Sequence, residues 1–236
     1  MISCKKENNL ANIITKKNPL ELIAQLGDLE SDYSIKVSTS LGHSLTGTNS
    51  FSKASVFIEA FNNDEENIGE LLVENQTIPF IEKSYFLQLD TTQNPLLFTG
   101  KQNTYQLNGN NFPNFNITNY SSSLTDITFS GLSNNKLPRN SSLIINWTPD
   151  ENLPISAESA VYLSAEDENG EIITLCKLVD DSNGNISISS SEMNLFSEVE
   201  KIRVYYAKGF SNLHNISGKK IAIGSIGFTY CTIFFQ

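Results

Sequence analysis

The residues that could support acid–base catalysis or bind a metal ion are few and lie far apart in the sequence. The two histidines are His43 and His214, and neither has an acidic residue or a cysteine close to it in the chain. A catalytic triad or a zinc site would need one of them to meet its partners across the fold. The spacing gives no sign of this, so we interpret both as solvated loop histidines.

Three short acidic runs could supply the carboxylate pair of a glycoside hydrolase. They are Asp64-Glu65-Glu66, Glu166-Asp167-Glu168 and Asp180-Asp181. Each lies where a turn between strands is expected, and acidic residues are common in turns. We therefore expect a protein that is not an enzyme. A glycan-active enzyme remains the last of the alternatives, with the run from Glu166 to Glu168 as the residues to mutate.

The segment Asp181-Ser182-Asn183-Gly184-Asn185 partly resembles a calcium-binding loop, because oxygen-bearing side chains alternate before a glycine. An EF-hand needs a further oxygen ligand two residues earlier, and Val179 stands at that position. A tight turn with Asn183-Gly184 in the left-handed conformation explains the same residues. We expect a turn here, with no bound metal and no cofactor.

Residues 111–120 interleave aromatic rings with amide side chains. This mixture can stack on sugar rings while hydrogen bonding to their hydroxyls, so Phe112, Phe115 and Tyr120 are the candidate ligand-binding residues. That role requires the three rings to be exposed on one face. The alternative, which the sequence favours, is that they fill the core or pack at a domain junction.

Cys176 and Cys231 lie on two expected strands. A disulfide between them would stabilise the fold by roughly 4 kcal/mol, and an exported protein permits such a bond. Each cysteine can equally be a small buried apolar residue that keeps its thiol. The spacing cannot decide between these interpretations, and we favour two separate thiols.

Composition and charge restrict the class of protein. A net charge of −10 argues against a nucleic-acid partner, because phosphate binding needs clustered lysine and arginine. No apolar run reaches the length of about 18 residues that predicts a membrane-spanning helix. The apolar fraction of 39% is sufficient for a packed core, and the many Asn, Ser and Thr residues favour turns and strands.

The apolar residues mostly alternate along the chain with a period of two. Segments such as 33–37, 56–61 and 85–90 predict half-buried antiparallel strands, and turn-rich connections separate them. A short helix is expected at 18–27 and a single helical turn at 190–194. Short strands without βαβ spacing predict β-sandwiches.

Turn-forming residues at 131–136 indicate a domain boundary near the middle of the chain. We predict an all-β fold with two immunoglobulin-like antiparallel β-sandwich domains. The lipoprotein N-terminus and polar tether occupy residues 1–18, the N-terminal sandwich 19–135 and the C-terminal Ig-like sandwich 136–236.

The sequence begins Met1-Ile2-Ser3-Cys4-Lys5. This resembles the end of a bacterial lipoprotein signal, in which an apolar and a small residue precede the cysteine that receives a diacylglycerol. The resemblance implies that Cys4 is the lipid attachment site and that the protein is exported. The lysines that follow are similar to the export tag of Bacteroidota surface lipoproteins, which implies the outer membrane or cell surface. Only three residues precede Cys4, fewer than the charged and hydrophobic regions of a signal need.

Three features of the second half carry a further resemblance: the run Ser142–Pro149, Cys176 and the expected hairpin at Asn183–Ile188. Together they are similar to the C-terminal Ig-like domain of uncharacterised lipoproteins of Bacteroidota. Trp147 precedes both downstream cysteines, which departs from true immunoglobulins and puts their core disulfide in doubt. The resemblance implies an architecture and an envelope location, but no defined function.

These interpretations favour a non-catalytic binding or adhesion module, anchored in the membrane through a lipid on Cys4, with a glycan or protein ligand. The alternative is a structural subunit of a surface assembly, in which the terminal strand at 221–235 pairs with a neighbour's sheet edge. The sequence identifies neither the ligand nor the oligomeric state.

Overall fold

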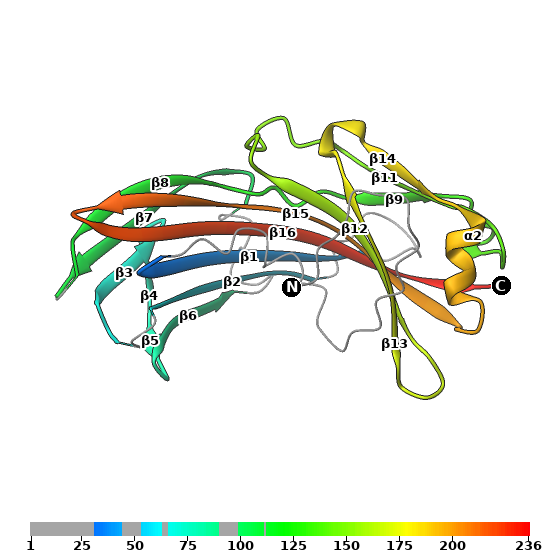
Figure 1. Ribbon diagram of the computed structural model, residues 1–236, viewed down its shortest axis with the longest axis horizontal. Helices are drawn as coiled ribbons and strands as arrows, with labels where there is room; N and C mark the ends of the chain where they lie inside the picture. The colour runs from blue at the N-terminus through cyan, green and yellow to red at the C-terminus, as the bar shows by residue number, and fades with distance from the viewer. Residues whose placement is uncertain (1–30, 44–52, 63–65, 90–98, 111) are drawn as a thin grey trace.

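Strands make up most of the part of the chain that the computed structural model describes, which is residues 31–43, 53–62, 66–89, 99–110 and 112–236. The prediction of an all-β protein is therefore confirmed (Figure 1). Cys4 and the helix expected at 18–27 lie outside the described residues.

The strands follow the expected alternation of buried and exposed side chains. In chain order they are β1 (Tyr33–His43), β2 (Lys53–Asn62), β3 (Gly69–Val73), β4 (Gln76–Ile78), β5 (Phe80–Ile81), β6 (Ser84–Leu89), β7 (Lys101–Gly109), β8 (Phe115–Ser121), β9 (Ile127–Ser130), β10 (Lys136–Leu137), β11 (Leu143–Trp147), β12 (Glu158–Glu166), β13 (Ile172–Val179), β14 (Asn185–Ile188), β15 (Lys201–Ile216) and β16 (Lys219–Phe235). The helical segments are η3 (Asp181–Asn183), α2 (Ser190–Met193) and η4 (Asn194–Phe196).

One long sheet extends along the whole molecule, and two small sheets pack against it (Figure 1). The long sheet has the order β13-β12-β15-β16-β1-β2-β6-β5, with β10 paired to β16. The small sheets have the orders β4-β3-β7-β8 and β14-β11-β9. Because β15 and β16 pair from Lys201↔Phe234 to Ile216↔Lys219, this hairpin underlies both small sheets.

Two hydrophobic cores lie on the same face of the long sheet. The first core joins β3, β7 and β8 to β1, β2, β6 and the start of β16, where Ile221 and Ile223 belong to it. The second joins β9, β11 and β14 to β12, β15 and the end of β16, where Cys231 and Ile233 belong to it. These four β16 residues are spaced by even numbers, so their side chains share one face of the strand.

The structure does not confirm the predicted arrangement of two separate Ig-like sandwiches. Strands on both sides of the predicted boundary at residues 135 and 136 belong to the same long sheet. In addition, β1 pairs with β16 in parallel, so the sheet is not purely antiparallel. The physical reason is the length of β15: a strand of 16 residues spans about 50 Å, enough to cover both cores.

Local turn signals predict connections better than they predict strand partners. The turn expected at Asp167–Gly170 joins β12 to β13 as a hairpin, and α2 confirms the helical turn expected near residue 190. The hairpin expected at Asn183–Ile188 is wrong, because β13 pairs with β12 whereas β14 pairs with β11. The turn itself is present, and it carries the chain from the long sheet to a small one.

Candidate functional site

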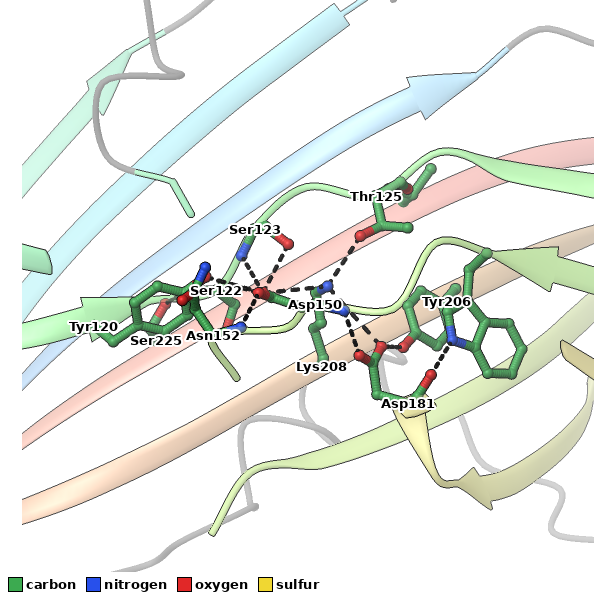
Figure 2. A network of polar contacts seen from close by, with 12 residues as sticks. Tyr120, Ser122, Ser123, Thr125, Asp150, Asn152, Asp181, Tyr206, Lys208 and Ser225 are labelled. Atoms are coloured by element: carbon green, nitrogen blue, oxygen red, sulfur yellow. Dashed lines mark hydrogen bonds and ion pairs between the residues drawn. The ribbon is translucent and has the colours of Figure 1, made fainter. Parts of the chain in front are cut away.

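A buried cluster of charged side chains lies between the two cores and is the main polar feature of the described structure (Figure 2). We call Lys208, Asp150 and Asp181 the ionic cluster. Lys208 comes from the middle of β15, Asp150 from the connection between β11 and β12, and Asp181 from η3. Segments far apart in the sequence therefore meet at one point of the long sheet.

Lys208 occupies a core position of β15. It lies on the same face of the strand as Ile202, Val204 and Tyr206, and its side chain is 1% exposed. Its Nζ is 3.4 Å from Asp150 Oδ2 and 4.0 Å from Asp181 Oδ1. Nζ also donates a hydrogen bond to Thr125 Oγ1, over 2.9 Å.

Asp150 is held by several hydrogen-bond donors. Tyr120 Oη donates to both carboxylate oxygens, at 2.9 and 3.1 Å, and the Ser123 hydroxyl and backbone N–H donate to Oδ2 at 2.7 and 3.2 Å. The backbone N–H of Asn152 donates to Oδ1. Burial alone would raise the pKa of Asp150, but the bonds from Ser123 and the charge of Lys208 outweigh it and keep the pKa below its ordinary value.

Asp181 connects the cluster to an aromatic pair in the second core. Its carboxylate accepts hydrogen bonds from the Tyr206 hydroxyl and from the backbone N–H of Asp150. Its backbone carbonyl accepts a bond of 2.8 Å from Trp147 Nε1, and the Trp147 ring stacks on Tyr206 at 4.6 Å. Burial and then the bond to Asp181 raise the pKa of the Tyr206 hydroxyl, so this group stays a neutral donor.

The chain between β8 and β9 closes the site over β16. Ser122 N–H donates to Ser225 Oγ, and Thr229 Oγ1 donates to the carbonyl of Thr125. Gly227 lies beneath this segment, and a Cβ there would come within 3.0 Å of the Ser123 carbonyl. The glycine thus allows the donors of Ser123 to come close to the sheet and reach Asp150.

The ionic cluster is closed to dissolved substrates. The side chains of Lys208, Asp150 and Asp181 are 1%, 4% and 8% exposed. Burial lowers the pKa of Lys208, and the two carboxylates oppose this effect. The ionic cluster can stabilise the packing of the segments that carry Asp150 and Asp181 on the long sheet. Any covalent chemistry in it is restricted to its own side chains.

The aromatic residues proposed for ligand binding are turned inward. Phe115 and Tyr120 are each 6% exposed, and the Phe112 ring packs on Tyr33 with centroids 5.6 Å apart. Tyr120 stacks on Phe210 and donates to Asp150. The three rings do not form an exposed face, in agreement with the alternative that they fill the interior.

Cys176 and Cys231 are not brought together. In the long sheet, β12 and β15 lie between the strands that carry them, and Cys231 faces the second core whereas Cys176 pairs with Tyr162 on the other face. Three inter-strand spacings amount to about 14 Å, and a disulfide needs Cα atoms within about 7 Å. A bond between these two cysteines would require the sheet to open.

The acidic runs mainly build turns. Asp167 accepts hydrogen bonds from the backbone N–H groups of Asn169 and Glu171, and Asp180 caps η3 through Ser182 N–H. Of the first run, only Glu66 is among the described residues. The sequence did not single out Asp150 or Lys208, although a lysine in register with Ile202, Val204 and Tyr206 was the available signal.

The histidines do not lie in loops, so that expectation is wrong. His43 is the last residue of β1, and His214 is in β15, where burial lowers its pKa. In the described part of the chain, no three His, Cys, Asp or Glu side chains are grouped so that they could hold a metal ion. No helix among the residues searched is long and apolar enough to cross a membrane.

No protein-family model matches this chain, and no curated protein is significantly similar to it. Any functional assignment therefore depends on the architecture and on the residues described above.

Proposed function

We propose that this protein is a non-catalytic binding or adhesion module of the cell envelope, attached to the outer membrane or cell surface by a lipid on Cys4. The observation that carries the proposal is the β15–β16 hairpin, which extends along the molecule beneath both cores (Figure 1). A continuous sheet of about 50 Å suits a module that holds a glycan- or protein-binding end away from its membrane anchor.

The use of the charged residues supports a binding role over a catalytic one. Asp167 and Asp180 are used in turns, and the ionic cluster is closed to solvent. The aromatic rings of Phe112, Phe115 and Tyr120 stabilise the interior. The ligand surface is therefore to be sought among exposed side chains, without a cofactor.

The anchor is tested by expressing the full gene and its Cys4→Ala variant in the native host. We expect the wild-type protein in the membrane fraction, with a diacyl or triacyl mass on a peptide that begins at Cys4. The variant should move to the soluble fraction. Wild-type protein with an unmodified Cys4 thiol would contradict the lipoprotein part of the proposal.

Binding is tested with glycan arrays and protein arrays of host and microbial ligands. The folded wild-type protein is the probe, and the same chain unfolded in urea and diluted is the control. We expect saturable binding to one ligand class only with the folded chain. Blank results on both kinds of array would contradict a binding module.

A structural subunit remains the alternative, but a strand other than β16 would have to pair with a neighbouring molecule. The terminal strand β16 has β15 on one side and β1 on the other, so it is not an edge strand. The ends of the sheet order are β5, which has two residues, and β13, an apolar segment of eight residues with Lys177 in its second half. Size-exclusion chromatography at rising concentration tests edge pairing, and a monomer throughout would contradict it.

A further inference from the structure

We propose that Lys208 and Asp150 condense to form an intramolecular amide, an isopeptide bond that links β15 covalently to the connection between β11 and β12. The proposal goes beyond the binding function and does not depend on it. It assigns a chemical role to the ionic cluster, whose groups are closed to outside substrates.

The two groups lie close together. Lys208 Nζ is 3.4 Å from Asp150 Oδ2, so the amine lies beside the carboxyl group whose Cγ it attacks, and holding two reacting groups together lowers the entropic part of the barrier. Lys208 is fixed in β15 between β12 and β16, and donors on three sides fix Asp150. Little rotational freedom is left for either group to lose when they react.

Water is largely excluded from Lys208 and Asp150. The two side chains are 1% and 4% exposed, so hydration does not stabilise the separate charges. Burial lowers the pKa of Lys208 and thereby favours the neutral amine that acts as the nucleophile. The hydrogen bonds that Asp150 accepts keep its side chain in the carboxylate form. We therefore expect the isopeptide bond to form slowly after folding.

Hydrogen-bond donors surround the carboxyl group of Asp150. Attack on Cγ places negative charge on a carboxyl oxygen, and donors aimed at that oxygen stabilise the transition state. Ser123 N–H and Oγ–H point at Oδ2, and Tyr120 Oη–H points at both oxygens (Figure 2).

The reaction balances without any other reactant. The Lys208 ammonium transfers one proton to Asp150, which gives an amine and a carboxylic acid. The amine attacks Cγ, and Asp181, whose Oδ1 is 4.0 Å from Nζ, accepts the second proton. The leaving oxygen receives a proton in exchange and departs as water. The third proton stays on the amide nitrogen, and Asp181 is a carboxylate again.

Two other ion pairs provide matched controls within the same chain. Lys177 Nζ is 2.6 Å from Glu192 Oε1, with exposures of 27% and 20%, and Lys101 Nζ is 3.2 Å from Glu74 Oε2, with exposures of 41% and 25%. Both pairs are closer than Lys208 and Asp150, but water reaches them. We expect neither pair to condense.

The test is mass spectrometry of the full chain carrying Cys4→Ala, so that no lipid alters the mass. We expect an intact mass lower than the sequence mass by one water molecule. Trypsin acting on the denatured protein should cleave after Lys177 and Lys219 but not after Lys208. The resulting branched peptide joins residues 140–177 to residues 204–219. An unchanged intact mass together with cleavage after Lys208 would overturn the proposal.

Variants separate the roles of the three residues. Lys208→Arg and Asp150→Ala should abolish the loss of water, and Glu192→Gln should leave it unchanged. Asp181→Asn keeps the side-chain volume and removes the proton acceptor, so the bond should form at least tenfold more slowly in protein whose circular dichroism matches the wild type. An unchanged rate in Asp181→Asn would overturn the role of Asp181. The wild-type mass decides the bond itself even if a variant fails to fold.

Discussion

Two turns of this chain have the same Asp-x-Asn-Gly pattern and different surroundings. Asp167–Gly170 joins the neighbouring strands β12 and β13, and its aspartate faces solvent. Asp181–Gly184 carries the chain from the long sheet to a small sheet, and its aspartate is 8% exposed beside Lys208. Both glycines have a positive φ, +79° and +68°. The shared pattern thus determines the turn, and the strands on either side determine the burial of the aspartate.

The two turns should differ most in how much stability the protein loses when the aspartate of each turn is replaced by alanine. Asp181→Ala leaves the Tyr206 hydroxyl and the backbone N–H of Asp150 without their acceptor. Each buried donor left without an acceptor costs about 1–3 kcal/mol of unfolding free energy. The matched control Asp167→Ala should cost far less. Urea denaturation of both variants measures the difference, and equal losses would contradict the comparison.

A smaller effect is expected for the tyrosine hydroxyl that donates to Asp181 in the turn at 181–184. Tyr206→Phe removes the hydroxyl that donates to Asp181, and a hydrogen bond to a charged group contributes about 1.5–3 kcal/mol. The variant should therefore unfold at a lower urea concentration at neutral pH. A midpoint equal to the wild-type value would show that the hydroxyl contributes nothing.

The same residue predicts a pH dependence. Burial and the bond to Asp181 raise the pKa of Tyr206, so the unfolded chain releases this proton at lower pH than the folded chain. Stability from this group is present below about pH 10, the ordinary tyrosine pKa, and is lost as the pH rises further. Urea midpoints between neutral pH and pH 11 should fall less steeply in Tyr206→Phe. Identical slopes would contradict this contribution.

The smallest difference is expected between the two glycines. Gly170→Ala and Gly184→Ala each place a side chain at positive φ, which costs about 1 kcal/mol. A Cβ at Gly184 meets the Trp147 carbonyl at an acceptable 3.4 Å, and at Gly170 the nearest atom is 3.7 Å away. Thermal unfolding should therefore show similar losses. A much larger loss at Gly184 would mean that the turn at 181–184 also depends on its exact backbone path.

The sequence was sufficient for local structure. The alternation in 56–61 and 85–90 predicted β2 and β6, and the turn signals at 167–170 and 190–194 predicted connections that the structure contains. These features depend on neighbouring residues in the chain. The period of two and the conformational preference of glycine therefore suffice for them.

The sequence was insufficient for the partners of each strand and for the ionic cluster. The sequence predicts a loop around His214, but this residue lies inside β15, where the nearby Asn212 donates to Asn119 of β8. Lys208 resembles a surface lysine until Asp150 and Asp181 are placed beside it. These contacts join residues that are far apart in the sequence, and no local pattern reports them.

We expect the two halves to unfold as one unit because β15 and β16 underlie both cores. Trp147, the single tryptophan, reports on the second core, whereas Leu71 is fully buried in the first. Leu71→Ala should cost about 2–5 kcal/mol, and the most direct measurement is the urea midpoint of Trp147 fluorescence in this variant. The account predicts that the midpoint falls together with that of circular dichroism. An unchanged Trp147 midpoint, with a separate earlier transition in circular dichroism, would contradict a single unit and indicate two independent domains.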